Sequence, residues 1–464
     1  MKNELKIFDS LSNKKTNFIP FDKQNIRIYA CGPTVYDFAH IGNARMAVAC
    51  DVLVRVLRNI YPKVTYVSNI TDIDDKIIKK SIETSTPIKK ITQKFHKIYN
   101  EDMEKIGVEH PNVQPKATNY IKEMINAITK LIDTNNAYCV DGHVLFHVPS
   151  YKYYGSLSKR SIEEQIAGNR IDVAPFKKSN ADFVLWKPSK SDEPSWDSPW
   201  GKGRPGWHIE CSVMSEKTLS LPFDIHCGGA DLRFPHHDNE IAQSCCLIGK
   251  NMRPENFCRY WFHNGFVQVS GEKMSKSIGN IKLINTLLKN KSGQCIRLAL
   301  LSSHYRQPLN WTDSVLEQAE KNLERLNRIA KETENVKITN KEKTSFCCEI
   351  KDALMDDLNT PNVLGILFKM TKQLSEKKKL DQKKIKSNLQ FIKNNLGLSL
   401  KKNSKNKFFI KSEEKKFIEN LIKERNNARI EKNFEKADKL RKKLEILGVT
   451  ISDTKNDTSW KKTK

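Results

Sequence analysis

The chain has 464 residues, 38% of them apolar, which exceeds what one hydrophobic core usually organises and predicts roughly two to four domains. Its net charge of +26, from 80 Lys and Arg against 54 Asp and Glu, indicates either solvated lysine-rich faces or a polyanionic partner such as nucleic acid. Eleven cysteines without paired spacings argue against a disulfide scaffold, and neither a signal sequence nor about 18 consecutive apolar residues occurs, so we expect a cytoplasmic protein that does not bind membranes.

The N-terminal part predicts a strand, a loop and a helix. The apolar run Ile26–Ala30 precedes the loop Cys31–Asn43, and apolar residues then recur at helical spacing from Val48 to Leu57. The start of this helix near His40 presents unpaired backbone N–H groups, which favour an anion such as phosphate. A second strand, Val64–Val67, completes a βαβ unit. Because ligands bind beyond the carboxyl ends of parallel strands, we expect Cys31 and His40 to face a site.

An insertion is predicted to separate two halves of this fold. A helical pattern begins at Ile121, and short strand-like runs follow at Val144–Val148 and Phe183–Trp186. The stretch from Lys187 to Gly206 is rich in Pro, Ser, Gly and Trp and is expected to form a long loop rather than regular structure.

The remaining chain is expected to be helical and basic. Helical spacing from Val315 onward, broken at Thr360–Pro361, predicts a helical bundle. Residues 401–464 hold 20 Lys and Arg against 10 Asp and Glu, and within them the stretch Ala428–Arg441 predicts a charged helix that ends near Gly448.

These patterns define an α/β fold class. A Rossmann-like, parallel-sheet catalytic domain with an insertion is followed by a helical bundle and a small basic C-terminal domain. The expected parts are the first half of a nucleotide-binding catalytic domain (1–120), an inserted connective segment (121–200), the second catalytic half (201–270), a region with a lysine-containing loop (271–314), the bundle (315–400) and the basic domain (401–464).

A metal site is suggested by four residues at predicted strand ends or helix starts. Cys31, Cys211, a histidine and Glu240 form a mixed thiolate, imidazole and carboxylate set, which suits zinc. Each residue alone is also explained as a buried structural cysteine or a loop histidine. Spacing does not choose between His236 and His237, since both lie within a helical turn of Glu240.

Two short segments point to ATP chemistry. His40–Asn43 and Lys273–Ser277 lie about 230 residues apart on the two sides of the split fold, and together they resemble the two signature sequences of class I aminoacyl-tRNA synthetases. Donors at a helix start and lysines on a loop can neutralise the α-phosphate of ATP and the leaving pyrophosphate.

Longer segments carry a closer resemblance. The chain is similar to the cysteinyl-tRNA synthetase family from Phe8 to Trp460, and the segments that carry the similarity are Cys31–Asp37, Asn69–Lys76, Gly203–Cys211, Phe234–Glu240 and Glu272–Ser277. The resemblance implies an ATP-dependent ligase that forms cysteinyl-adenylate and transfers cysteine to cysteine tRNA. It also implies one zinc ion per chain, held by Cys31, Cys211, His236 and Glu240, which takes the thiolate of L-cysteine.

The resemblance implies further roles. ATP is expected to bind together with Mg²⁺. The protein is expected to be a monomer. The residues implied are His40, Asn43, Lys273 and Lys276 in catalysis; His40, Gly42, Asn43, Gly229, Asp231 and Lys276 in ATP binding; Thr34 and Trp207 in the amino-acid pocket; and Arg429, Phe434, Asp438 and Asp453 in reading anticodon bases.

Two positions depart from the family pattern. Many relatives have a second histidine where Asn43 stands, and Cys227 occupies a position that is often glycine, near the expected nucleoside site. Two rival functions are a related ligase that couples cysteine to a small amine, and a non-catalytic RNA-binding paralogue. The extension beyond residue 314 argues against the first rival, and the intact lysines and metal ligands argue against the second.

Overall fold

The structure is a computed structural model, and it describes residues 4–161, 176–249, 252–275, 278–372, 379–400, 412–431, 433–453 and 458–462. The chain divides into two compact units, Met1–Leu400 and Lys401–Lys464.

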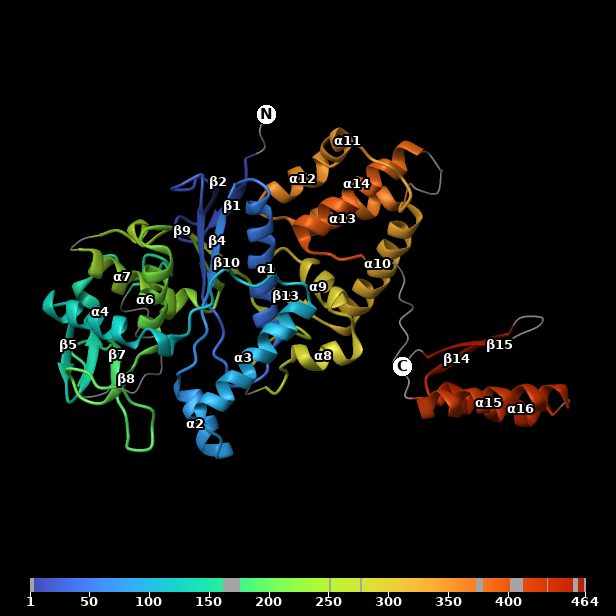
Figure 1. Cartoon of the computed structure of the whole chain (residues 1–464), viewed down its shortest axis with the longest axis horizontal. Coiled ribbons are helices and arrows are strands. Elements are labelled where there is room, and N and C mark those ends of the chain that lie inside the picture. Colours follow the sequence, from blue (N-terminus) through green and yellow to red (C-terminus); the bar gives the residue numbers. More distant parts are fainter. Residues whose placement is uncertain are drawn as a thin grey trace. The chain divides into compact units, whose positions relative to one another are not determined.

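A four-stranded parallel sheet lies at the centre of the first unit (Figure 1). Its strands are β3 (Ile26–Ala30), β4 (Val64–Ser68), β9 (Phe223–Gly229) and β10 (Cys258–Asn264), in the order β10-β9-β3-β4. Helix α1 (Ile41–Arg58) connects β3 to β4. The predicted βαβ unit and the parallel sheet split between two halves of the chain are therefore confirmed.

The two faces of this sheet are covered by different helices. Helix α1 lies against one face, and α6 (Trp207–Leu219) lies against the other, with α7 (Asp238–Ile248) packed on α6. Because successive side chains of a strand point to opposite faces, Ile28 and Ala30 pack in the core beside α1, whereas Tyr29 and Cys31 pack in the core beside α6. Alternation along β3 therefore carries Cys31 toward the side of the sheet that holds Cys211.

The inserted segment contains α4 (Ile121–Asp133) and a four-stranded antiparallel sheet. Its strands are β5 (Ala137–Val140), β6 (His143–Phe146), β7 (Phe183–Pro188) and β8 (Gly203–Pro205). The loop predicted from Lys187 to Gly206 is wrong at its two ends, because Lys187 pairs with Arg204 across β7 and β8. Backbone pairing with a strand already in the sheet outweighs the turn-forming composition there.

A helical hairpin connects β4 to the insertion, and helices also follow the catalytic part. The hairpin consists of α2 (Asp75–Thr84) and α3 (Ile88–Lys105). The later helices are α8 (Ile284–Asn290), α9 (Gly293–Leu301), α10 (Asp313–Glu332), α11 (Asn340–Ser345), α12 (Cys348–Met355), α13 (Thr360–Lys372) and α14 (Lys379–Leu396), and the predicted helical bundle is confirmed. The short strands are β1 (Lys6–Asp9), β2 (Lys14–Asn17), β11 (Val267–Val269), β12 (Glu272–Lys273) and β13 (Leu309–Trp311).

One buried arginine ties α9 to two other parts of the first unit. Arg297 is fully buried, forms an ion pair with Asp51 of α1, and donates to the backbone carbonyl of Leu396 at the end of α14 at 2.6 Å. The helical bundle is thus joined to the helix that begins at His40.

The second unit is a helical hairpin followed by a β-hairpin. It contains α15 (Ser412–Ile430), α16 (Phe434–Ile446) and the antiparallel strands β14 (Val449–Asp453) and β15 (Thr458–Lys462). The prediction of one continuous charged helix from Ala428 to near Gly448 is wrong at its start, although α16 ends at Ile446, close to the predicted end. The chain breaks between α15 and α16, where the Asn433 side chain accepts a hydrogen bond from the backbone N–H of Lys436 and caps the second helix.

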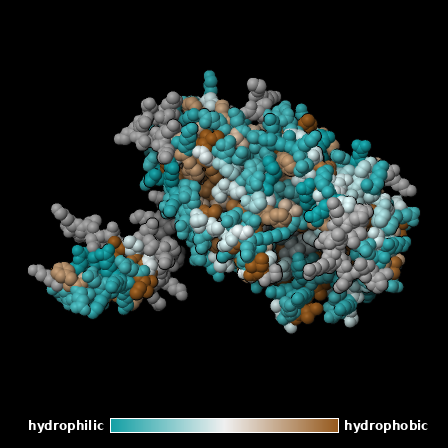
Figure 2. Space-filling model, turned by 180° about the vertical axis from the view of Figure 1, so that it is seen from behind, coloured by the Kyte–Doolittle hydropathy of each residue, from teal (hydrophilic) through white to brown (hydrophobic). Residues whose placement is uncertain are grey.

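The surface and the thiols agree with the composition. Figure 2 shows that the face opposite to that of Figure 1 is mostly hydrophilic, with apolar residues scattered in small groups. No helix among the described residues is long and apolar enough to cross a membrane. All eleven cysteines are free thiols.

Candidate functional site

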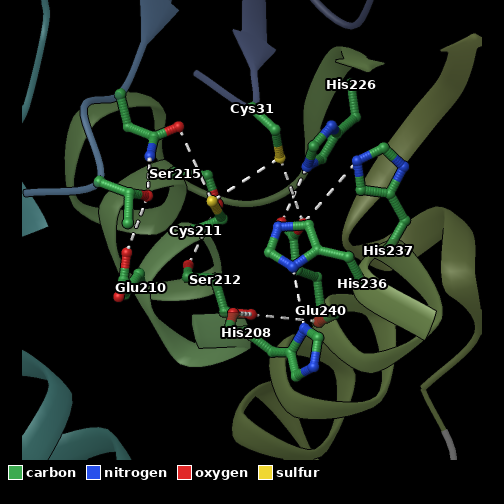
Figure 3. Close-up of polar contacts among 12 residues, drawn as sticks. Cys31, His208, Glu210, Cys211, Ser212, Ser215, His226, His236, His237 and Glu240 are labelled. Carbon is green, nitrogen blue, oxygen red and sulfur yellow. Dashed lines mark hydrogen bonds and ion pairs between the residues drawn. The ribbon is translucent and has the colours of Figure 1, made fainter. Parts of the chain in front are cut away.

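The four predicted metal ligands come together on the α6 side of the sheet. Cys31 follows β3, Cys211 lies on α6, His236 belongs to a short turn (Arg233–His237), and Glu240 lies on the first turn of α7 (Figure 3). The Cys31 Sγ atom is 3.7 Å from the Cys211 Sγ atom and 3.4 Å from Glu240 Oε1, and His236 Nε2 is 3.1 Å from the same carboxylate oxygen. All four side chains are buried, so they form a closed set of donors.

A second set of donors shares Cys31 and Glu240 but adds His226 and His237. His226 Nε2 lies 2.9 Å from Glu240 Oε2, on the side of the carboxylate away from His236. His237 Nε2 is 4.0 Å from Glu240 Oε1 and has no hydrogen-bond partner among the described residues, while His237 Nδ1 is 2.8 Å from His263 Nε2. Both histidines that spacing left open therefore face the same carboxylate.

The chemistry of these donors fits a metal ion. Burial lowers the pKa of His236 well below its ordinary value, so the imidazole is neutral and can donate a lone pair. Burial also raises the pKa of the Cys31 thiol; in Cys211 the hydrogen bond from Cys31 lowers the pKa, but burial and the nearby carboxylates outweigh it. A cation at the centre of the set would stabilise the two thiolates, because metal binding to cysteine displaces the thiol protons.

Neighbouring side chains fix the orientation of the donors. His236 Nδ1 lies 2.9 Å from Nδ1 of His208, whose pKa burial lowers to about 4. The Asn69 side-chain oxygen accepts a hydrogen bond from the Gly32 N–H at 2.8 Å and lies 3.7 Å from the Cys211 Sγ atom. Such outer contacts hold metal ligands in place.

The two residues expected in the amino-acid pocket lie beside this cluster. Trp207 is the first residue of α6 and is 40% exposed, and its ring stacks on the His236 imidazole with centroids 4.2 Å apart and planes inclined by 25°. Thr34 lies three residues after Cys31, in a β-bridge with Thr71. The indole therefore forms an open wall next to the buried donors.

The segment His40–Asn43, one of the two predicted to take part in ATP chemistry, caps the start of α1. His40 is the N-cap, with its Nδ1 accepting from the Asn43 backbone N–H at 3.3 Å, while the Asn43 side-chain oxygen accepts from the His40 backbone N–H at 3.1 Å. This capping box orders the first turn of a helix that points its N-terminus at the carboxyl edge of the sheet. Asn43 performs the capping with its amide side chain.

The lysine-containing loop reaches the same helix start. A Cβ atom added to Gly42 would lie 3.4 Å from the Met274 side chain, and the Ile41 N–H donates to the Lys282 carbonyl at 2.9 Å. Lys273 places its ammonium 4.3 Å from the centre of the Phe266 ring. Lys276 lies outside the described residues. The structure thus brings two segments about 230 residues apart in sequence next to each other.

The residues expected near the nucleoside follow β9. Gly229 ends this strand, and a Cβ atom there would lie 2.3 Å from a carboxylate oxygen of the exposed Asp231. Cys227, which precedes Gly228 and Gly229, is fully buried in the core beside α1. Alternation along the strand places the thiol inside the sheet's packed face.

The residues predicted to read anticodon bases lie in the second unit. Arg429 near the end of α15, Phe434 at the start of α16 and Asp438 one turn later are exposed, with Phe434 64% exposed. Asp453 is the last residue of β14 and pairs with Thr458. The first three lie on a helical hairpin, and Asp453 lies on the β-hairpin that follows it.

Sequence reasoning missed several residues of the metal cluster's surroundings. His226, His208 and Asn69 were not identified, although each contacts a predicted ligand. The one available signal was His226, a histidine within the strand Phe223–Gly229. Its side chain points away from the core that holds Ile225 and Cys227.

Comparisons with known proteins agree with this geometry. The family described as tRNA synthetases class I (C) catalytic domain matches residues 17–321, and the DALR domain family matches residues 349–401. A cysteine–tRNA ligase from Parvibaculum lavamentivorans is 47% identical and covers 99% of this chain and 98% of its own length, and one from Rhodospirillum rubrum is 45% identical and covers 99% of both.

Solved structures show the same fold at low sequence identity. A leucyl synthetase from Agrobacterium radiobacter, in a ternary complex with tRNA, has a TM-score of 0.60 at 12% identity and covers 82% of this chain and 84% of its own. A methionyl-tRNA synthetase from Mycobacterium tuberculosis, in complex with methionyl-adenylate, has a TM-score of 0.56 at 13% identity and covers 81% and 92% of the two chains.

Proposed function

Because the chain belongs to the cysteine–tRNA ligases, a family of class I tRNA synthetases, we propose that its buried Cys, His and Glu cluster holds one zinc ion and thereby recognises the side chain of L-cysteine. The residues proposed as ligands are Cys31, Cys211, His236 and Glu240. When bound, zinc supplies a soft Lewis acid that can accept the substrate's thiolate as a further ligand, since zinc can expand to five-coordinate.

The observation that carries this proposal is the position of the two thiols. Cys31 and Cys211 lie 3.7 Å apart at the carboxyl edge of the sheet, and His40 follows Cys31 by only nine residues in the chain. The thiol-recognising cluster and the phosphate-binding start of α1 are thus two ends of one loop.

The proposed first step joins cysteine to ATP. The carboxylate oxygen of cysteine attacks the α-phosphorus of ATP, a P–O bond forms, and the bond to the β-phosphate oxygen breaks to release pyrophosphate with its Mg²⁺. His40, Gly42 and Asn43 at the start of α1 are proposed to face the developing phosphate charge, and Lys273 and Lys276 are proposed to help neutralise it. Gly229 and Asp231 approach the nucleoside, with the carboxylate accepting from ribose hydroxyls.

The proposed second step transfers the acyl group. The 2′-hydroxyl of the terminal adenosine of cysteine tRNA attacks the cysteinyl carbonyl, an ester bond forms, and AMP leaves. Four residues of the second unit, Arg429, Phe434, Asp438 and Asp453, are proposed to contact anticodon bases. We propose that one chain performs both steps as a monomer in the cytoplasm.

This arrangement predicts selection without a separate editing step. A hydroxyl in place of the thiol is a hard ligand that stays protonated, and a methyl group offers no ligand, so serine and alanine lose the interaction that cysteine makes. Trp207, whose ring stacks on His236, and Thr34 are proposed to limit the size of the side chain that enters.

The deciding experiment is amino-acid-dependent exchange of label between pyrophosphate and ATP by the purified full-length chain. We expect exchange with L-cysteine, about one zinc per chain by elemental analysis, and at least about 100-fold weaker exchange with serine. Lys276→Ala is expected to reduce exchange and leave the zinc content unchanged. Equal exchange with serine would refute selection by the metal, and loss of zinc in Lys276→Ala would refute the division of roles.

A further inference from the structure

The hairpin formed by α2 and α3 carries a concentration of positive charge beside the active site. We propose that the exposed lysines of this hairpin bind backbone phosphates of the tRNA whose 3′ end enters the site. This inference rests on the proposed function, because it names a surface that delivers the RNA substrate to the same catalytic edge.

The charge of the hairpin exceeds its share of the chain. The hairpin, residues 75–105, contains eight lysines and five acidic residues, a net +3 in 31 residues, whereas the whole chain carries +26 in 464. Residues 75–98 hold seven of these lysines and only two of the acidic residues. The seven are Lys76, Lys79, Lys80, Lys89, Lys90, Lys94 and Lys97, and all but the half-buried Lys80 are exposed. A lysine-rich face of this kind attracts the phosphates of nucleic acid.

Little of this charge is neutralised within the protein. Of the two acidic residues within 75–98, Asp75 bonds to Arg204 and Lys187 of the insertion, and Glu83 lies 3.8 Å from Lys79. Lys97 has a long contact with Glu101 at 3.9 Å. Lys105, at the end of α3, lies 3.8 Å from Asp102. Among the residues that the structure describes, Lys76, Lys80, Lys89, Lys90 and Lys94 have no carboxylate within 4.0 Å.

The hairpin begins at the edge of the sheet where the reaction takes place. Six residues separate the carboxyl end of β4 from the start of helix α2, and Asp74 caps this helix by accepting from the Lys76 N–H at 2.7 Å. In Figure 1 the hairpin extends below the sheet, and α2 forms its lower tip. An RNA end that approaches this edge therefore passes the hairpin.

Helix α3 packs against the loop between Cys31 and His40. Phe95 packs edge-on against Phe38 with ring centroids 5.3 Å apart, and Ile91 belongs to the same small core as Val35. Phe38 and Val35 lie within the loop between Cys31 and His40. The buried side of α3 thus contacts the active-site loop, and the lysines occupy its solvent side.

Three lysines of α3 form a regular stripe. Lys90, Lys94 and Lys97 are spaced at i, i+4 and i+7, so they share one face and span about 10 Å of helix axis. The cores of protein interfaces are depleted in lysine and enriched in aromatic residues, so this stripe fits an RNA backbone better than a protein partner. A row of ammonium groups contacts phosphates without reading bases.

The test neutralises the stripe in the full-length chain with Lys90→Gln, Lys94→Gln and Lys97→Gln together. We expect cysteine-dependent pyrophosphate exchange, which needs no tRNA, to stay within about twofold of wild type, and the KM for tRNA in aminoacylation to rise about tenfold or more. The slope of log affinity for tRNA against log salt should become shallower by about 2 to 3, since three phosphate contacts are removed.

A charge-matched control uses Lys14→Gln, Lys23→Gln and Lys63→Gln. All three lysines are exposed: Lys14 lies on β2, and Lys23 and Lys63 lie just before β3 and β4, at the amino edge of the sheet. The triple variant should therefore keep wild-type tRNA affinity. Replacing the stripe by arginine should also keep it. An unchanged KM and salt slope in the Lys90, Lys94 and Lys97 variant would overturn the proposal and leave the stripe to another partner.

The two proposals fail in different ways. If no amino acid supported pyrophosphate exchange by the wild-type chain, the proposed function would fail before any tRNA was added. If the control triple weakened tRNA binding as much as the stripe triple, a general loss of charge would explain the effect, and the hairpin assignment would be wrong.

Discussion

Gly32→Ala tests whether the close approach of two loops holds the metal cluster. Gly32 follows the ligand Cys31, and a Cβ atom there would lie 1.6 Å from the carbonyl oxygen of Asn69 and 2.7 Å from its carbonyl carbon. The side-chain oxygen of the same asparagine accepts the Gly32 N–H at 2.8 Å. The substitution therefore acts on the contact that positions Cys31, while the thiol itself is unchanged.

The size of the effect follows from the overlap. Non-bonded carbon and oxygen atoms rarely approach within about 3 Å, so the two backbone segments must separate by more than about 1 Å. Metal ligands tolerate deviations of about 0.2 Å, and displacements of about 1 Å at an active site can cost about 100-fold in rate. We expect zinc affinity and cysteine-dependent pyrophosphate exchange to fall by about 100-fold each.

The assay combines zinc content, thiolate-to-Co²⁺ charge-transfer absorption of the cobalt-substituted protein, and pyrophosphate exchange. Gly365→Ala is the matched control, because nothing lies within 4 Å of a Cβ atom at this position of α13 and alanine favours a helix by about 0.5–1 kcal/mol. A Gly32→Ala protein with wild-type zinc affinity and exchange would refute the reasoning. A cooperative thermal transition in both variants separates a local effect from loss of the fold.

Three further changes test the packing, the thiols and the pocket. Arg297→Met should destabilise the first unit by about 3–5 kcal/mol in urea unfolding, because it leaves the buried Asp51 without this partner, and adding Asp51→Asn should recover part of the loss. Burial raises the pKa of Cys245 to about 12, so about one Cys245 thiol in 10⁴ is ionised at pH 8, and its alkylation should increase as the pH rises. Mass spectrometry should find the exposed Cys139 alkylated before Cys245, and the reverse order would contradict the burial of Cys245. Trp207→Ala should raise the KM for cysteine in exchange about tenfold with the KM for ATP unchanged, and an unaltered cysteine KM would remove the indole from the pocket.

Much of the catalytic fold follows from local patterns in the sequence. The run Ile26–Ala30 matches β3 residue for residue, and the helix expected near His40 begins at Ile41. Apolar spacing and turn residues act over a few positions, so they predict strands and helices without information from the rest of the chain. The prediction failed where a short polar interruption competed with helical spacing, as at Asn433.

The sequence also predicted the types of ligand at the candidate site, because cysteine, histidine and glutamate at strand ends and helix starts suit a metal ion when the fold brings them together. The sequence alone could not decide which histidine faces Glu240, since His236 and His237 are adjacent and both lie close to its carboxylate. Nor did the sequence alone indicate that alternation along β9 turns Cys227 into the core beside α1.

The sequence by itself determined the strands, the helix starts and the chemical types of the donors, all of which depend on neighbouring residues. Only the tertiary structure decided that Cys31 meets Cys211, 180 positions later, and that the loop after β12 reaches Gly42. The physical reason is that these contacts depend on how α6 and α7 pack against one face of the sheet and how α1 covers the other. Side-chain packing over such separations is set by the whole core, which no local pattern records.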